Sequence, residues 1–285
     1  MNKVTLSILG CGWLGHGLLK ELELDYKQVK VSGRNKDKLS DLEDLGIKTF
    51  KIDLSEASEN WDSQFFQTRY LLIAIPPTRE NNPGMLSHSQ QIDKLIKKLK
   101  ELNFQGTIIY CSSTSVYEQG AGEFDEKSKT APTTIAGQEI IRAEKILYDS
   151  NINAVILRLG GLYGHQRHPI HFLAGRENLS SPEKTVNLIH IKEISIIFDR
   201  LINKLESEQI KDSDNYHIFN LVNDIDLTRK HYYTLCAKLK SLSAPSFNES
   251  EKQNDIKADV SFLRKIKNEK VKKILNINFN FTYLI

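Results

Sequence analysis

The chain has 285 residues, of which 40% are apolar and 26% are charged, and its formal net charge is +3. This length can bury a sizeable core, and the composition is that of a globular protein. The weak positive charge is spread along the chain and gives no argument for nucleic-acid binding. Three widely separated cysteines, Cys11, Cys111 and Cys236, have no metal-ligand spacing and suit a reducing cytosol, so we expect no metal site.

The first stretch has the order strand, glycine turn, helix. An apolar run at residues 4–9 is followed by Gly10, Gly12 and Gly15 in G-x-G-x-x-G spacing, and helical periodicity follows to Leu22. The apolar run is too short for a signal peptide or a membrane span, so we expect a cytoplasmic protein without membrane contact.

Each glycine of this stretch has a physical function in a dinucleotide site. Gly10 permits the tight turn, Gly12 lets a pyrophosphate approach the backbone, and Gly15 lets helix and strand pack closely. The helix start carries unpaired N–H groups and positive dipole character, which favour a diphosphate. We therefore predict that these glycines, with Trp13 and Leu14, bind a dinucleotide; a purely structural turn is the alternative.

Strands and helices alternate over the next 140 residues. The pattern predicts strands at 28–31, 47–52, 70–75, 106–110 and 154–159, with helices at 36–45, 92–99 and 137–149. Such alternation predicts a parallel sheet wound by right-handed crossovers, a doubly wound α/β (Rossmann) fold with strand order 3-2-1-4-5-6.

The chain after residue 160 has a different texture. A loop with histidines and prolines spans 165–182, a helix is expected at 192–205 and a seventh strand at 216–222, and helices are expected at 229–242 and 260–275. The basic run 264–273 is interpreted as the solvated face of the last helix. We predict a Rossmann domain at 1–160 and, at 161–285, a mixed region with the last sheet strand and a small substrate-binding lobe.

A series of motifs suggests a family. These are the glycine fingerprint, Asp53-Leu54 and the segments 112–117, 158–164, 187–191 and 216–220. In order and spacing the chain resembles the extended short-chain dehydrogenase/reductases of the nucleoside-diphosphate-sugar epimerase/dehydratase type. The resemblance implies an NAD(P) cofactor and a sugar-like or nucleotide-linked small-molecule substrate, and it leaves a homodimer open.

The resemblance breaks at the residues that carry the family's chemistry. Counted from Pro132 to Glu144, the family's Tyr-x-x-x-Lys pair falls on Ala136 and Ile140. The tyrosine exchanges a proton and the lysine, one helical turn on, holds the ribose and lowers the tyrosine pKa. Alanine and isoleucine do neither, so the chain resembles an atypical subgroup that lacks this pair.

The end of the second expected strand normally determines the type of cofactor. An acidic residue there would bind the ribose of NAD, whereas an arginine accepts the 2′-phosphate of NADP. Residues 32–35 contain Arg34 and no acidic residue, so we predict NADP rather than NAD; a solvated turn is the alternative for Arg34.

Two further strand ends are expected to contact the cofactor. Asp53 and Leu54 flank the adenine by resemblance, although Asp53 could instead cap the following segment. Ala74 and Ile75 end the fourth expected strand, and with Pro76 they complete the predicted cofactor site.

Three residues are candidates for catalysis. Ser113 matches the family's serine that hydrogen-bonds the reacting oxygen, although the alternative is that it only satisfies backbone groups at the strand end. Tyr117 could replace the missing tyrosine, with packing as its other interpretation. His168 is our choice of proton donor because histidine titrates near neutral pH, against the alternative of a solvated loop residue.

These observations predict an NAD(P)-dependent oxidoreductase or epimerase-like enzyme without the Tyr–Lys pair. The alternative is a cofactor-binding protein without turnover, in which NADP(H) occupancy controls a partner. The substrate and the direction of the reaction do not follow from the sequence.

Overall fold

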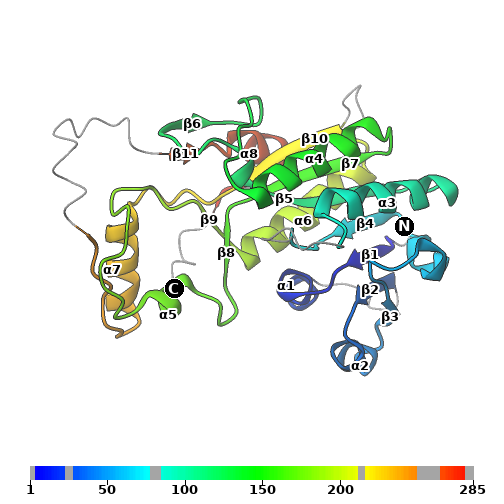
Figure 1. Ribbon diagram of the computed structural model, residues 1–285, viewed down its shortest axis with the longest axis horizontal. Coiled ribbons are helices and arrows are strands. Elements are labelled where there is room, and N and C mark those ends of the chain that lie inside the picture. The colour runs from blue at the N-terminus through cyan, green and yellow to red at the C-terminus, as the bar shows by residue number, and fades with distance from the viewer. Residues whose placement is uncertain (1–3, 23–27, 78–84, 211–215, 249–263, 280–285) are drawn as a thin grey trace. The chain divides into compact units, whose positions relative to one another are not determined.

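The computed structural model describes residues 4–22, 28–77, 85–210, 216–248 and 264–279 (Figure 1). The chain falls into two compact units, each assembled from segments that are distant in the sequence. The first unit comprises Met1–Glu118, Thr130–Arg158 and Ile202–Phe219; the second comprises Gln119–Lys129, Leu159–Leu201 and Asn220–Ile285. The domain boundary expected at residue 160 stays a prediction.

A seven-stranded sheet organises the described residues. Its strands are β1 (Leu6–Leu9), β2 (Val29–Gly33), β3 (Lys48–Lys51), β4 (Tyr70–Ile73), β5 (Thr107–Ser113), β7 (Ala154–Leu159) and β10 (Tyr216–Leu221). Their order is β10-β7-β5-β4-β1-β2-β3, and the pairs among β1 to β5 are parallel. The doubly wound α/β fold is confirmed, with the predicted strand order and the seventh strand.

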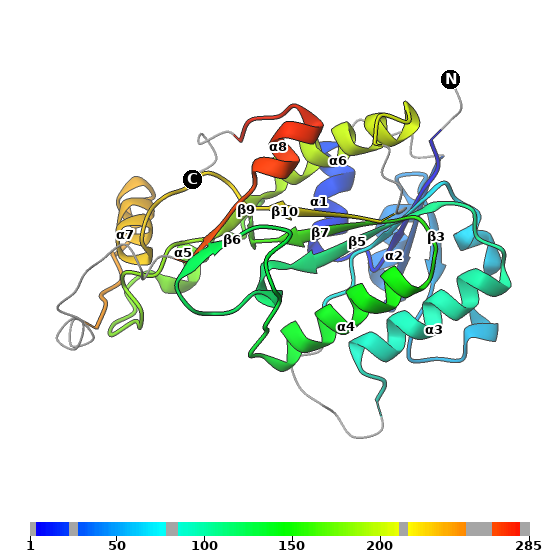
Figure 2. The same cartoon turned by 90° about the horizontal axis from the view of Figure 1, so that it is seen from above.

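Helices cover both faces of this sheet. Helices α3 (His88–Glu101) and α4 (Ile135–Asp149) lie on one face and α1 (Trp13–Glu21) lies on the other, while α2 (Lys36–Glu43) connects β2 to β3 (Figure 2). Short 3-10 helices follow β3 and β5, at η2 (Ser58–Asn60), η3 (Ser63–Phe66) and η4 (Thr114–Val116).

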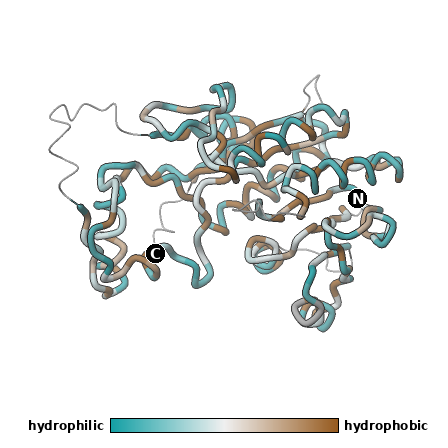
Figure 3. Tube along the Cα trace, viewed as in Figure 1, coloured by the Kyte–Doolittle hydropathy of each residue, from teal (hydrophilic) through white to brown (hydrophobic). Residues whose placement is uncertain are grey.

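The strands β1, β4 and β7 are buried along their whole length, as near-continuous apolar runs require, whereas the edge strand β3 has exposed residues at both ends. All four residues of β1 and all four of β4 are buried, and Figure 3 shows apolar segments along the strands with alternating apolar and polar turns in α3 and α4. The polar exception in β1 is Ser7, whose hydroxyl donates a 2.7 Å hydrogen bond to the carbonyl of Phe65. The buried Ser7 hydroxyl therefore has the hydrogen-bond partner that a buried polar group needs.

Helix α3 begins four residues before its apolar stripe because a capping box fixes its start. The Ser87 side chain accepts from the Gln90 amide, and the Gln90 side chain accepts from the Ser87 amide at 2.8 Å. The neighbouring Ser89 donates from its amide and hydroxyl to Glu139 Oε2 of α4, at 2.9 and 2.7 Å. Burial alone would raise the pKa of Glu139, but these hydrogen bonds hold it at about 2, so a charged carboxylate joins the two helices.

A buried ion pair joins β5, α4 and β7. Arg158 donates from Nε and Nη2 to the two carboxylate oxygens of Glu144, at 3.0 and 2.6 Å, and from Nη1 to the Tyr117 hydroxyl at 2.8 Å. Ser112 adds a 2.5 Å hydrogen bond to Glu144. The Arg158 and Glu144 side chains are only 4% and 3% exposed, so each charge depends on the other for its counter-ion.

The second unit contains two small parallel pairs and several helices. The pairs are β6 (Gly122–Phe124) with β11 (Arg264–Ile266) and β8 (Gly161–Tyr163) with β9 (Leu188–His190). The helices are α5 (Pro169–Leu173), α7 (Arg229–Leu239) and α8 (Glu269–Leu275), and α6 (Ile191–Glu206) runs from this unit into the first. Within the described residues, no helix combines the length and apolarity needed to cross a bilayer.

The helix expected at 260–275 is wrong where the structure describes it. Residues 264–266 form β11, and the helix begins only at Glu269; residues 260–263 lie outside the described residues. The reason is tertiary, because the Asn187 side chain donates to the Arg264 carbonyl and accepts from the Ile266 amide, as a neighbouring strand would. Arg264 is 6% exposed, so its interpretation as part of a solvated helix face is also wrong.

Removing the arginine of the buried pair is expected to destabilise the fold strongly. Arg158→Met leaves the Glu144 carboxylate buried without its counter-ion, which costs about 3–5 kcal/mol. The control is Lys145→Ala, which removes an exposed pair with Asp149 and costs at most about 1 kcal/mol. Urea unfolding followed by circular dichroism measures both, and equal losses in the two variants would contradict the assigned role of Arg158.

Candidate cofactor site

The turn between β1 and α1 requires a glycine at its first position. Gly10 has φ +83°, and a Cβ at this residue would lie 2.5 Å from Ile75 Cγ2. The turn is closed by hydrogen bonds from the Gly12 amide to the Gly10 carbonyl (2.7 Å) and from the Cys11 amide to the Ser32 carbonyl (2.8 Å). Both the backbone conformation and the contact with Ile75 therefore exclude a side chain at residue 10.

Gly12 differs from Gly10 because nothing in the protein requires a glycine there. It is exposed, its φ and ψ of −90° and −152° are extended, and a Cβ would meet no atom within 4 Å. It is the N-cap of α1 but provides no side-chain cap. The missing side chain leaves open space at the helix start, as a ligand that must approach the backbone would need.

Gly15 lets α1 lie close to β1. A Cβ at residue 15 would lie 3.0 Å from Cys11 Sγ and 3.2 Å from Ile8 Cγ2, tighter than ordinary contact. Burial raises the pKa of the Cys11 thiol to about 12, so Cys11 is an uncharged packing residue. Gly10 and Gly15 thus have the surroundings that a tight turn and close helix–strand packing need, while the contact of Gly12 with a pyrophosphate stays a prediction.

The start of α1 is an electropositive backbone surface. Its first turn, which includes Trp13 and Leu14, has no acidic residue, and the first amides of a helix have no intrahelical acceptor. Trp13 is half-buried and Leu14 is buried, so these two side chains pack on the protein. Their backbone therefore provides the candidate contacts with a diphosphate.

The end of β2 lies next to the turn and presents Arg34. Ser32 Oγ accepts a 3.3 Å hydrogen bond from the Gly10 amide, which joins the two segments. Arg34 follows β2 and is exposed, and its charge, with that of Lys51, contributes to a lowered pKa at Asp53. The guanidinium is thus available at the strand end beside a carboxylate.

Asp53 hydrogen-bonds the turn that directly follows β3, and it is not the N-cap of the next helix, η2, whose N-cap is Ala57. Its carboxylate accepts from the amide and hydroxyl of Ser55, at 2.9 and 2.7 Å, and these bonds lower its pKa against the opposing effect of burial. Leu54 is 4% exposed and belongs to the core. The carboxylate is half-buried near Arg34, which keeps a contact with an adenosine group open to it.

The chain after β4 completes this edge of the sheet. The Ala74 amide donates to the Leu9 carbonyl at 2.9 Å, Ile75 contacts Gly10 and Pro76 is exposed. Since the strands are parallel, their carboxyl ends meet at one edge, where doubly wound sheets bind ligands. The structure therefore brings together the glycine turn and the residues predicted at the ends of β2, β3 and β4.

Ser113 ends β5 and caps the 3-10 helix η4. Its Oγ accepts from the Ser115 amide at 3.1 Å, so its O–H remains able to donate, and the residue is half-buried. Tyr117 is fully buried and its hydroxyl accepts from Arg158, which favours the packing interpretation for this residue.

The first turn of α4 packs against the same loop. A Cβ on Gly137 would lie 2.9 Å from the Ser115 carbonyl, so the helix start and the loop after β5 are in close contact. On this helix Ala136 is half-buried and Ile140 is 3% exposed. The two positions where the family pattern expects the Tyr–Lys pair therefore carry side chains that can only pack.

His168 lies in the second unit and is buried rather than solvated. It is the N-cap of α5, its Nδ1 accepts from the Ile170 amide at 3.2 Å, and its Nε2 lies 3.2 Å from the Tyr232 hydroxyl. With 4% exposure and both ring nitrogens engaged, His168 has the surroundings of a structural residue. Its role as proton donor stays a prediction.

Two polar groups near β5 were not singled out from the sequence. His88 is 1% exposed, its Nε2 lies 2.7 Å from the Tyr110 hydroxyl, and burial lowers its pKa to about 4 although Glu139 opposes this. The buried pair of Arg158 could have been predicted from the sequence, because an arginine within an apolar strand needs a buried carboxylate, here Glu144. No comparable spacing signal points to His88.

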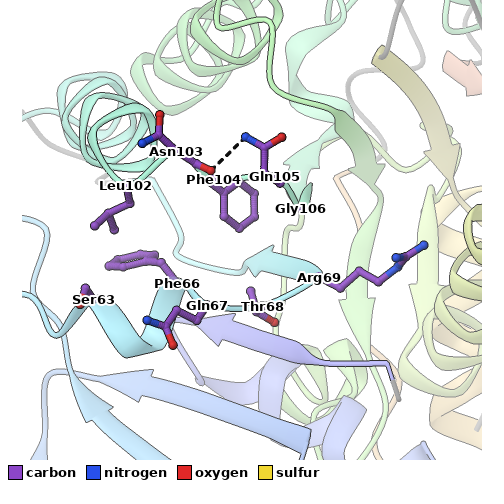
Figure 4. Close-up of a pocket in the computed structure, with 10 residues that line it drawn as sticks. All are labelled: Ser63, Phe66, Gln67, Thr68, Arg69, Leu102, Asn103, Phe104, Gln105 and Gly106. Atoms are coloured by element: carbon purple, nitrogen blue, oxygen red, sulfur yellow. Dashed lines mark hydrogen bonds between the residues drawn. The ribbon is translucent and has the colours of Figure 1, made fainter. Parts of the chain in front are cut away.

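A hollow of about 410 Å³ lies at the other end of the strands. It is lined by Ser63, Phe66, Gln67, Thr68, Arg69, Leu102, Asn103, Phe104, Gln105 and Gly106 (Figure 4). These residues precede β4 and β5 or follow α3, so the hollow is at the amino-terminal edge of the sheet. The glycine turn is at the carboxyl edge, and the hollow is therefore separate from the cofactor site.

The fold is that of a doubly wound α/β protein, and comparison with known proteins defines the class. The chain belongs to the NAD(P)H-binding family, whose sequence model matches residues 10–187.

Individual proteins are similar to this chain in sequence or in fold. The chain is 28% identical to Protein YeeZ from Escherichia coli over 253 residues, 88% of each chain. It is similar to a functionally unknown conserved protein from Silicibacter pomeroyi DSS, with a TM-score of 0.69 and 21% identity over 99% of this chain and 95% of the other. MoeE5 in complex with UDP-glucose and NAD gives a TM-score of 0.75 at 14% identity, over 98% and 95%. The chain thus shares its fold with these solved structures, and the family model gives its NAD(P)H-binding class.

The different surroundings of Gly12 and Gly10 predict different effects of the same substitution. Gly12→Val should abolish binding of the NAD(P) cofactor while the fold remains, because its side chain occupies only the open space at the helix start. Gly10→Val is the contrasting variant and should unfold or strongly destabilise the protein, because φ is positive and Ile75 blocks the Cβ. Thermal melts with and without cofactor measure both effects. Retained stabilisation by cofactor in Gly12→Val would refute this site.

Proposed function

We propose that the first unit binds NADP(H) in preference to NAD(H). The observation that carries the proposal is the open, unblocked start of α1 at Gly12, with Arg34 at the adjacent end of β2. Among residues 32–35 there is no acidic side chain to bind a ribose diol, whereas the guanidinium suits a 2′-phosphate. The NAD(P)H-binding family supports the cofactor class without distinguishing the two forms.

The expected preference is moderate because of the surroundings of Arg34. Charge-assisted hydrogen bonds contribute about 1.5–3 kcal/mol, and exposure to solvent places Arg34 toward the lower end. The Asp53 carboxylate interacts electrostatically with Arg34, and its negative charge partly offsets the attraction of Arg34 for a phosphate. We therefore expect roughly a tenfold preference, since about 1.4 kcal/mol corresponds to a factor of ten.

The reaction we propose is oxidation–reduction or epimerisation of a sugar-like or nucleotide-linked small molecule. The bound nicotinamide supplies hydride chemistry, and Ser113 donates a hydrogen bond to the reacting oxygen of the substrate. The support for Ser113 is its position at the carboxyl end of β5 with an O–H that its capping bond leaves unused. The similarity in fold to MoeE5, whose complex contains UDP-glucose and NAD, supports the substrate class.

A protein without turnover is the second candidate function. Its specific support is the packing of Ala136 and Ile140 where the family pattern expects the proton-transfer pair, together with the engaged nitrogens of His168. In this case binding of NADP(H) would itself be the signal, read by a partner. The cofactor site is the same in both candidates, so cofactor binding alone does not separate them.

Arg34→Ala is expected to remove the preference for NADP(H). Its dissociation constant for NADPH should rise roughly tenfold, while that for NADH changes little, because only the former has the 2′-phosphate. The control is Lys20→Ala, which removes an exposed cation from the last turn of α1. Isothermal titration calorimetry with both cofactors gives the values, and equal affinities of the wild-type protein for NADPH and NADH would end the NADP assignment.

Turnover separates the enzyme from the sensor. The assay uses NADPH or NADP with a panel of nucleotide sugars that includes UDP-glucose. If the protein is an enzyme, the rate of turnover should fall about 10²-fold in Ser113→Ala, the usual effect of losing one preorganised hydrogen-bond donor. Ser113→Thr, which keeps a hydroxyl, should recover much of this rate. Product formation is followed by chromatography. Tight NADPH binding without turnover on any member of the panel would favour the sensor.

A further inference from the structure

Two buried histidines of the second unit contact the same tyrosine. The ring centroid of His168 lies 5.4 Å from that of Tyr163, and the ring centroid of His190 lies 4.9 Å from it, both in edge-to-face geometry. His168 is 4% exposed and His190 is 7% exposed. The chain at the end of β8 lies so close to His190 that a Cβ on Gly164 would be 2.7 Å from Nε2 of the ring. The two histidines therefore belong to one tightly packed cluster.

Each histidine caps a helix, and both use the same ring atom. His168 Nδ1 accepts from the Ile170 amide at the start of α5, and His190 Nδ1 accepts from the Lys192 amide at the start of α6, both at 3.2 Å. The Glu193 carboxylate accepts in return from the His190 amide at 3.4 Å. Helix α6 thus begins with a reciprocal pair of bonds like a capping box, in which a histidine stands where serine or threonine is usual.

These bonds determine the protonation state of both rings. A backbone N–H can only donate, so the Nδ1 that accepts from it carries no proton, and the proton of the neutral ring is on Nε2. In His168 this Nε2 donates to the Tyr232 hydroxyl at 3.2 Å. A second proton would turn Nδ1 into a donor that faces another donor, and it would place a positive charge at the positive end of a helix. Both helix starts therefore require a neutral histidine.

The groups around the pair also disfavour a charged ring. Besides Tyr163, the titratable and charged groups of the surrounding elements are His165 and Arg167 before α5, His171 on α5, Lys192 and Glu193 on α6, and Tyr232 and Cys236 on α7. The carboxylate in this set, Glu193, is engaged by the His190 amide. Burial lowers the pKa of His190 to about 4, and the positive charges of Lys192, His165 and His168 act in the same direction.

The direction of this pKa shift gives the direction of the pH dependence. An ordinary histidine titrates at 6.5, so an opened helix start takes up a proton on His190 at a higher pH than the closed one does. The stability that neutral His190 contributes is therefore complete above pH 6.5 and is lost progressively as the pH falls toward about 4.

We propose that His168 and His190 are an acid-sensitive pair of helix caps, which weakens the starts of α5 and α6 together as the pH falls below about 6. Because both rings contact Tyr163, a charge on one histidine repels a charge on the other, and opening of the two helix starts relieves this repulsion. The pair contains no residue of the candidate cofactor site, so this inference goes beyond the proposed function and does not depend on it.

Hydrogen exchange followed by mass spectrometry between about pH 7.5 and about pH 5 tests the proposal in the wild-type protein. After correction for the intrinsic exchange rate, the protection of amides at the starts of α5 and α6 should fall by up to about tenfold per pH unit for each histidine, because each takes up one proton on opening. Amides at the start of α4 are the internal control and should keep their protection, because their N-cap is the hydroxyl of Thr134, which does not titrate.

Substitution by asparagine keeps a cap and removes the titration. His168→Asn and His190→Asn each retain a side-chain acceptor at the helix start, since asparagine is a good N-cap. Each should abolish the pH dependence at its own helix and leave protection at about pH 7.5 close to that of the wild type. The matched control is His231→Asn, which changes an exposed histidine in the first turn of α7 and should leave the pH dependence of α5 and α6 unchanged.

Nitrogen NMR of the histidine rings in the wild-type protein is a second measurement that needs no folded variant. At neutral pH both rings should carry their proton on Nε2, and His190 should titrate at a lower pH than an exposed histidine does. The proposal is overturned if protection at α5 and α6 does not change with pH, or if it falls equally at α4. It is also overturned if the folded asparagine variants keep the wild-type pH dependence, or if either ring is protonated on Nδ1 at neutral pH.

Discussion

The absence of side chains along one face of the β1–α1 turn is the constraint on which the rest of the structure depends. Ile75 fills the space at Gly10, and Ile8 with Cys11 fills the space at Gly15, so α1 lies close to β1 and β4. Among these three glycines of the turn, Gly12 alone leaves open space where a side chain would be. Close packing at Gly10 and at Gly15 thus leaves the start of α1, with its positive dipole, accessible at Gly12.

The parallel sheet turns this local feature into a site. Because β1, β2 and β4 end at the same edge, the turn, Arg34 and Ile75 come together although they are distant in the chain. At β5, the Glu144 carboxylate of the buried pair with Arg158 accepts a hydrogen bond from Ser112, which fixes the end of this strand against α4. Buried charges are costly unless fully paired, and here the pairing fixes the segment that presents Ser113.

The sequence predicted best those features that depend on residues close to one another in the chain. Alternating strands and helices predict the strand order, and glycine spacing with the position of Arg34 predicts one edge of the sheet. The start of α3 was missed because its cap, Ser87 with Gln90, lies outside the apolar stripe on which the expected helix rested. Periodicity reports which residues are buried, and a polar cap carries no such signal.

The errors and surprises come from partners far away in the sequence. The strand at 264–266 depends on the side chain of Asn187, and the burial of His168 depends on Tyr232, 64 residues later. No window of the sequence contains both members of such a pair.

A crystal structure of the protein with NADPH bound is the most direct test of the central claim that the open start of α1 and Arg34 together hold this cofactor. We expect the diphosphate at the amides that follow Gly12, with the 2′-phosphate within hydrogen-bond distance of the Arg34 guanidinium. A diphosphate located away from the glycine turn, or a 2′-phosphate with no contact to Arg34, would contradict it.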